Sequence, residues 1–197
     1  MRLSSFIIAR QDRILNEWDA FAETLLPVSA GMSRAAIRDH AAEMLAAIAK
    51  DLASEQTPSE QVAKSKGNAP PFAGAPETAA QTHALLRAQS GFDINQMAAE
   101  YRALRASVLR LWAAEYSPTP TDLQDTIRFN EAIDQSLAES LAYFTKELDR
   151  SRNLLLGMLG HDMRNPLSVV VRSNASASRR RLAPTVASAL GCTSHGK

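Results

Sequence analysis

Residues 121–156 contain neither proline nor glycine, the two residues that most often end or break a helix. Apolar side chains recur there at alternating steps of three and four residues, the spacing that places them on one helical face. Thr119 can cap this helix and Pro120 suits its first turn. Its apolar register, with one polar position at Asn130, comprises Leu123, Ile127, Ile133, Leu137, Leu141, Phe144, Leu148, Leu155 and Met158. A helix of about forty residues spans about 60 Å, more than a small domain can cover, so we expect its C-terminal half to pair with a second copy in a parallel homodimer.

The residues before this stretch predict further helices. Apolar residues at helical spacing predict a first helix over residues 3–25, closed by Pro27, and a second that begins after Ser33 and carries an apolar stripe over residues 37–52. Residues 54–76 are rich in Pro, Gly, Ser and Lys and have no periodicity, which predicts a long mobile loop.

Two more helices are predicted, one before and one after Gly91. A short helix containing His83 ends at Gly91, which readily takes the left-handed conformation that terminates helices. Asp93, with Gln96 three residues later, fits a capping box that starts the next helix. The apolar stripe of that helix comprises Met97, Tyr101, Leu104, Val108 and Leu111. No segment alternates as a strand would, so the predicted fold class is all-α.

Length and composition limit the function. A chain of 197 residues can form one well-buried domain and a smaller element. Its 22 basic and 21 acidic residues leave a net charge of +1, so no overall field attracts nucleic acid or an anionic membrane. The single cysteine, Cys192, excludes an internal disulfide and fits a reducing compartment. The apolar run at residues 6–9 is too short for a signal peptide or a membrane span. We expect a cytoplasmic protein with neither a membrane nor a nucleic acid as partner.

The stretch LGHDMRNPLSVVV, residues 159–171, combines a histidine with an acid and an amide. On a helix, His161 and Asn165 lie one turn apart on the same face, and Asp162 lies about 100° round from the histidine. Phosphoryl transfer to imidazole needs a neutral ring and a group that takes up the developing positive charge, and Asp162 is placed for this. Pro166 removes one backbone hydrogen bond and is expected to loosen the helix beside the histidine.

The string HDMRNPL resembles the H-box of sensor histidine kinases at every specified position. The resemblance implies that His161 is the phosphoacceptor, Asp162 the acid/base of transfer and Asn165 a residue that assists the phosphatase reaction. It also implies a response regulator receiver domain as partner, and an ATP-binding kinase domain, with ATP and Mg²⁺, that would act in trans or is missing here. The alternative is an exposed histidine near a chance Asn-Pro.

The string HALLRAQSGFDINQMAAEYRALRASVLRLW, residues 83–112, resembles the RsbRD-type sensor domains of stressosome proteins and of some kinases. The resemblance covers about residues 5–150 and implies a helical, globin-like dimer that has lost its haem. Within the string, Glu100, Arg102 and Arg105 are either a signalling surface or an ordinary solvated face.

No cofactor or metal is expected. His83 lies next to the polar loop in sequence, without an evident apolar box, and His40 is a second, weaker candidate for haem ligation. The four histidines, which include His195, are too far apart in sequence to repeat a metal-ligand spacing. Cys192 has no fixed base or acid near it in sequence and is expected to be a bystander thiol.

The predicted organisation is a helical sensor domain over residues 1–150, the start of a phosphoacceptor domain over 151–171, and a disordered tail over 172–197. The basic run at residues 179–181 leaves nucleic-acid binding as an alternative for that tail, but we expect a remnant of a truncated kinase. The leading hypothesis is the sensing and phosphoacceptor part of a two-component histidine kinase that cannot phosphorylate itself. The alternative is a non-catalytic, stressosome-like scaffold that dimerises and in which His161 is never phosphorylated.

Overall fold

The long predicted helix is present as α7, Leu123–Arg181. It follows a single 3-10 turn, Pro120–Asp122, in which the Thr119 amide donates a hydrogen bond of 2.7 Å to Oδ2 of Asp122. The helix continues without a break past Pro166, where we had expected it to loosen. This computed structural model describes residues 1–25, 34–70, 77–117 and 119–181. Within these ranges, it describes only the backbone of residues 34–37, 39, 121 and 160–181.

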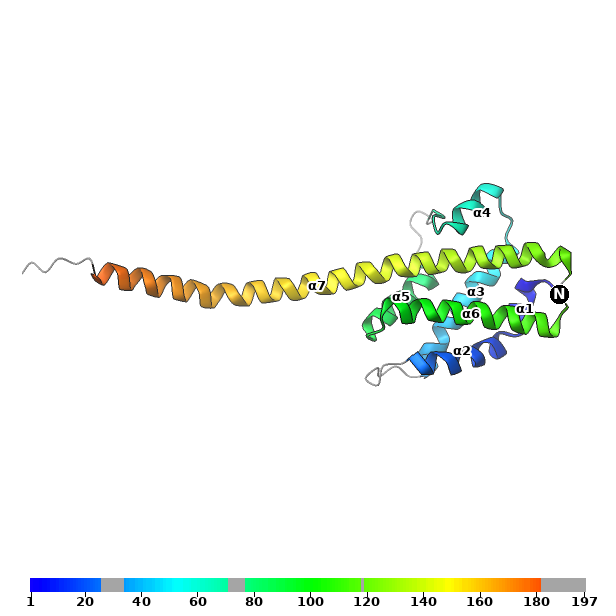
Figure 1. The fold of residues 1–197 in the computed structure, drawn as a ribbon, viewed down its shortest axis with the longest axis horizontal. Coiled ribbons are helices and arrows are strands. Elements are labelled where there is room, and N and C mark those ends of the chain that lie inside the picture. The colour runs from blue at the N-terminus through cyan, green and yellow to red at the C-terminus, as the bar shows by residue number, and fades with distance from the viewer. Residues whose placement is uncertain (26–33, 71–76, 118, 182–197) are drawn as a thin grey trace, which may run out of the picture. The chain divides into compact units, whose positions relative to one another are not determined.

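The chain divides into two compact units, Met1–Arg150 and Ser151–Lys197. All other described helices belong to the first unit, where α7 lies alongside α3 and α6 (Figure 1). We expected a disordered tail from residue 172, but α7 extends through residues 172–181, a segment rich in the helix formers Ala and Arg and free of Pro and Gly. Residues 182–197 lie outside the described residues.

The predicted first helix is split in two. Helix α1 spans Leu3–Ala9 and α2 spans Gln11–Leu25, with a break at Arg10. Nε of Arg10 donates a 2.7 Å hydrogen bond to Oε2 of Glu115, at the C-terminal end of α6. Both helices still turn their apolar residues inward, so the stripe was predicted correctly and its continuity was not. Helix α3 spans Arg34–Ala53, and the predicted cap Ser33 lies outside the described residues.

The predicted mobile loop contains a helix, α4, Pro58–Ser65. The Thr57 hydroxyl accepts from the Glu60 amide and the Glu60 carboxylate accepts from the Thr57 amide, a complete capping box. After this helix Gly67 has φ +66°, and a Cβ added there would collide with Cβ of Ala138 on α7. The loop prediction was wrong because the polar residues that cap this helix, Thr57 and Glu60, were interpreted as part of a loop.

The next two helices agree with prediction. Helix α5 spans Ala79–Gln89 and is followed by Gly91 at φ +77°. Helix α6 spans Ile94–Glu115, and the carboxylate of Asp93 accepts hydrogen bonds from the amides of Asn95 and Gln96. The described residues contain helices and no strand, so the predicted all-α fold class is confirmed.

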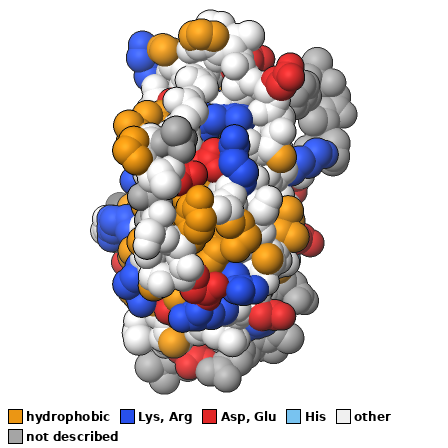
Figure 2. Space-filling view, turned by 90° about the vertical axis from the view of Figure 1, so that its right-hand side faces the viewer, with side chains coloured by type: hydrophobic (Ala, Val, Ile, Leu, Met, Phe, Trp, Pro, Cys, Tyr) orange, Lys and Arg blue, Asp and Glu red, His pale blue; other side chains and the backbone are white. Residues whose placement is uncertain are grey.

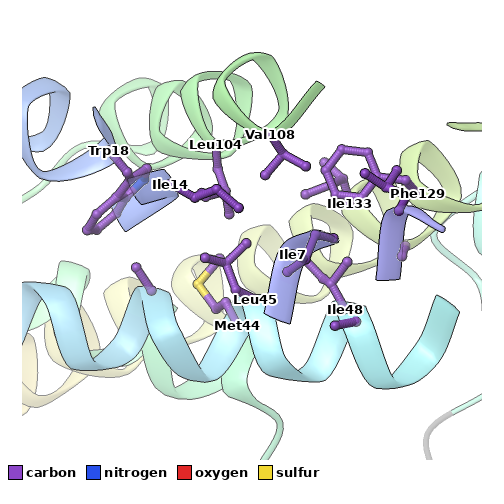
Figure 3. Packing of buried hydrophobic residues seen from close by; sticks show 14 of the residues in the cluster. Ile7, Ile14, Trp18, Met44, Leu45, Ile48, Leu104, Val108, Phe129 and Ile133 are labelled. Atoms are coloured by element: carbon purple, nitrogen blue, oxygen red, sulfur yellow. The ribbon is translucent and has the colours of Figure 1, made fainter. Parts of the chain in front are cut away.

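The core brings together the apolar faces of α1, α2, α3, α6 and α7 (Figure 3). Trp18, Leu45 and Phe129 are among its fully buried side chains. Each buried side chain of this size contributes about 1.5–3 kcal/mol relative to exposure, and Phe129 and Ile133 make α7 part of this core. The residues labelled in Figure 3 are Ile7, Ile14, Trp18, Met44, Leu45, Ile48, Leu104, Val108, Phe129 and Ile133.

The surface carries mixed charge. Figure 2 shows Lys and Arg side chains interspersed with Asp and Glu over one face. Ion pairs form at the surface of the first unit, among them Arg110 with Glu17 at 2.7 Å and Arg10 with Glu115. Among the described helices, none combines the length and apolar character that crossing a membrane would require.

Candidate functional site

A buried cluster of ionisable residues lies between α5 and α6. Nε of Arg87 donates to both carboxylate oxygens of Glu100, at 3.0 Å and 2.8 Å. Nε2 of His83, one turn before Arg87, lies 3.0 Å from Oε2 of Glu100. All three residues are at most 1 % exposed, so a histidine, a guanidinium and a carboxylate share a site closed to solvent.

Aromatic rings surround the guanidinium. Cζ of Arg87 lies 4.8 Å from the ring centroid of Phe92 and 5.7 Å from that of Trp18 on α2, distances at which a cation is attracted to the ring face. The ring of His83 meets that of Tyr101 edge to face, with centroids 5.7 Å apart. Aromatic contacts therefore replace part of the water that the buried charges have lost.

A hydrogen-bonded chain connects the cluster to α7. The hydroxyl of Tyr101 lies 2.6 Å from the hydroxyl of Ser140, which in turn donates to the carbonyl of Ala80 at 2.7 Å. Burial raises the pKa of Tyr101 well above its ordinary value, so the phenol stays protonated. These hydrogen bonds connect α5, α6 and α7 to one another.

The charge state follows from the environment. Burial would raise the pKa of Glu100, but hydrogen bonds with His83 and Arg87 and the positive charge of Arg87 outweigh it and lower that pKa below its ordinary value. Burial lowers the pKa of His83, and Glu100 offsets only part of this effect. At neutral pH the cluster is therefore one carboxylate, one guanidinium and one neutral imidazole. No described residue forms a hydrogen bond with Nδ1 of His83.

Two predictions about these residues were wrong. His83 was expected to lack apolar surroundings, yet it is fully buried and its ring contacts that of Tyr101. Glu100 was expected on a surface, and it is buried too, whereas Arg102 is exposed and Arg105 is half-buried and paired with Asp134. A usable signal was present, because Glu100 falls three residues after Met97 in the apolar stripe and His83 and Arg87 are four residues apart.

The H-box residues lie in the second unit. His161, Asp162 and Asn165 are in the continuous helix α7, so their one-turn spacing is present in the backbone, but their side chains are outside the described part of the chain. Cys192 and His195 are outside it altogether. The described residues contain no group of three His, Cys, Asp or Glu side chains that could hold a metal ion. Nδ1 of His40 lies 3.9 Å from Glu43 and is not part of the buried cluster.

Comparison with known families places the first unit. The first unit is all-helical and holds a sealed charged cluster. The family model for the RsbT co-antagonist protein rsbRD N-terminal domain matches residues 11–154, and the chain belongs to this family. Five residues of the string quoted for the resemblance contribute to the cluster: His83, Arg87, Phe92, Glu100 and Tyr101. The match ends before His161, and the comparisons give the histidine kinase assignment no support. No curated protein and no solved structure matches the chain significantly.

Proposed function

We propose that the chain is a non-catalytic sensor and scaffold protein of stressosome type that acts as a homodimer. The observation that carries this proposal is the family match over residues 11–154, which nearly coincides with the compact unit Met1–Arg150. The family is named for a co-antagonist, a protein that acts through its binding to other proteins. The buried cluster fits this role, because its polar atoms are closed to any substrate and instead fix three helices against one another.

The homodimer is supported by apolar residues that α7 leaves exposed. Leu148 is 48 % exposed and Leu155, one heptad later, is 62 % exposed. Leu154, Leu156, Met158 and Leu159 are each more than half exposed as well. Such a run of exposed large apolar side chains marks an interaction surface in a soluble protein. A second copy pairing in parallel through its own α7 would cover it.

The proposed seam is the C-terminal part of the apolar register that the sequence predicts. Leu137 and Leu141 stand at the centre of the predicted apolar register, but both are half-buried against the core of their own unit. Substitution there would damage the fold and the dimer together. The seam is tested by Leu148→Lys with Leu155→Lys, which should give a monomer by light-scattering mass at micromolar concentration.

A matched double variant controls for added charge. Ala142→Lys with Asn153→Lys adds the same two positive charges at exposed positions of α7, but off the proposed seam. This control should remain a dimer. A wild-type chain that is monomeric at micromolar concentration, or a Leu148/Leu155 variant that stays dimeric, contradicts the proposal.

A second candidate function is phosphoacceptance by His161, with relay to a response regulator. The motif HDMRNPL favours it, and the unbroken helix keeps His161 and Asn165 one turn apart. The two candidates are separated by incubating the full chain with a histidine kinase ATP-binding domain, Mg²⁺ and labelled ATP. Acid-labile label on the wild type that is absent from His161→Ala supports phosphoacceptance. An unlabelled chain, or label that survives the substitution, leaves the scaffold proposal as the function.

A further inference from the structure

A cleft of about 370 Å³ lies within the first unit, between α3, the N-terminal end of α5 and α7. Small-molecule sites in proteins have volumes of about 300–1,000 Å³, so this cleft is at the small end of that range. It is separate from the buried cluster, because none of the three ionisable residues of that cluster lines it. The described structure therefore holds a second feature that neither the family match nor the proposed scaffold role explains.

The walls of the cleft are mainly apolar. Met44 and Ile48 on α3, Ala80 on α5 and Ala132 on α7 contribute to them. Ala47, also on this wall, is itself exposed. Apolar walls of this kind bind the hydrocarbon part of a ligand, and each buried CH₂ group contributes about 0.8 kcal/mol.

Two carboxylates line the cleft, those of Asp51 and Glu139, and that of Glu139 has only neutral donors among the described residues. Its Oε2 accepts from the hydroxyl of Thr78 at 2.8 Å, and its Oε1 accepts from the side-chain amide of Gln135 at 2.7 Å. No described cation forms an ion pair with it. Lys64, at the same cleft, is already paired with Asp51, and Lys146, which lines an adjoining hollow with Glu139, is exposed.

Glu139 is thus a half-buried negative charge held in place but not neutralised. A carboxylate removed from water gains most from a cationic partner, and each of its oxygens can still accept a further hydrogen bond. A primary ammonium group is compact and carries three donors, which suits this position beside an apolar wall. A carboxylate-bearing ligand would meet like charge from Glu139.

We propose that this cleft binds a small primary amine with an aliphatic body, its ammonium group on Glu139 and its hydrocarbon chain against Met44, Ile48 and Ala132. The ligand would touch Ala132, Gln135 and Glu139 on α7, the helix that also carries the exposed leucines of the proposed dimer seam. Occupancy would therefore act directly on the helix through which a signal would have to leave the unit. The proposal names a ligand class for the sensor that the proposed function describes. Its test measures binding to the cleft directly, so its outcome does not depend on whether the scaffold proposal holds.

The test compares three probes of equal length with the full chain: n-heptylamine, n-heptanol and heptanoate, followed by isothermal titration and by ligand-observed NMR. Heptylamine should bind at least ten times more tightly than heptanol, and heptanoate should bind more weakly than both. Glu139→Gln should bring the amine and the alcohol to within threefold of each other. Glu147→Gln, a carboxylate on the same helix that does not line the cleft, is the matched control and should keep the amine preference.

A cleft-filling variant guards against a folding defect in Glu139→Gln. Ala47→Phe adds a side chain to the wall from an exposed position and should abolish binding of all three probes while thermal unfolding stays cooperative. Failure of all probes to bind the wild type overturns the proposal, as does equal binding of heptylamine and heptanol. Amine preference that persists in Glu139→Gln, or binding that persists in Ala47→Phe, places the site elsewhere and overturns it too.

Discussion

Arg87 and Glu100 face each other in the protein interior, with Nε of the arginine donating to both carboxylate oxygens and neither side chain more than 1 % exposed. Removing both charges from water costs several kcal/mol per ion, which their attraction offsets only when the geometry is good and the other polar atoms find partners. Here the aromatic rings of Trp18 and Phe92 and the imidazole of His83 supply those contacts. The pair therefore specifies how α5 and α6 meet.

Breaking this pair on one side should be far more damaging than removing both charges. Glu100→Ala leaves the buried guanidinium of Arg87 without its carboxylate partner, so the free energy of unfolding in urea should fall by about 3–5 kcal/mol. The double variant Arg87→Met with Glu100→Leu replaces both charges with apolar side chains of similar size and should lose less than half of that amount. A double variant as unstable as Glu100→Ala would show that the charges themselves stabilise the fold.

The surface pair between Arg10 and Glu115 is the matched control. Arg10 is largely exposed, and exposed pairs contribute little because solvent screens them. Glu115→Gln should therefore change the unfolding free energy far less than Glu100→Ala does. A loss as large at Glu115 would mean that burial is not what makes the Glu100 substitution costly.

Much of the fold could be predicted because its signals are local. The capping box at Asp93, the stop at Gly91 and the uninterrupted run into α7 depend only on neighbouring residues, and the structure confirms them. The break at Arg10 could not be predicted, because it accompanies a contact with Glu115, more than a hundred residues away in sequence. A periodic apolar stripe reports which face is buried, not whether the helix axis continues.

The candidate site was harder to predict than the fold. Its charged residues belong to two helices, and only tertiary packing shows that His83, Arg87 and Glu100 meet. Sequence reasoning assigns Glu and Arg to the surface by default, since such residues are rarely buried unless they are paired. The pairing partner could not be identified from one sequence. The position of Glu100 within the apolar stripe of its helix was the one feature of the sequence that argued for burial of this residue.

Two glycines with positive φ provide a matched test of a close helix approach. A Cβ at Gly91 would meet nothing within 4 Å, so Gly91→Ala should cost only the backbone strain, about 1 kcal/mol. A Cβ at Gly67 would collide with Ala138 on α7, so Gly67→Ala should cost at least about 1 kcal/mol more. Urea unfolding of both variants measures the difference, and equal costs would argue against close packing of this turn on α7.

Haem is expected not to bind, for a reason that differs from the one the sequence suggested. His83 is buried enough to be a ligand, but its Nε2 faces Glu100 at 3.0 Å and the rings of Trp18 and Phe92 pack on the neighbouring guanidinium. Reconstitution with haemin should give no stoichiometric Soret band. A band that disappears in His83→Ala but persists in His40→Ala would contradict this prediction.

The stability of the chain should depend on pH through His83. Burial depresses the pKa of its imidazole below the ordinary value of 6.5, so below pH 6.5 the unfolded chain binds a proton that the folded chain does not. The free energy of unfolding should therefore be highest above pH 6.5 and fall as the pH decreases, by up to about 1.4 kcal/mol per pH unit from this one group. The charges that face the imidazole are those of Glu100, Arg87 and, more weakly, His40.

Urea unfolding between pH 5.5 and 8 tests this prediction, because the depressed pKa of Glu100 acts only below about pH 4.5 and leaves this window unaffected. His83→Gln, which cannot take up a proton, should flatten the profile across the window, whereas His40→Gln should leave most of the slope in place. An unchanged slope in His83→Gln would contradict the prediction that the His83 imidazole causes the pH dependence. Retention of the slope by His40→Gln and its loss in His83→Gln would locate the pH dependence at His83.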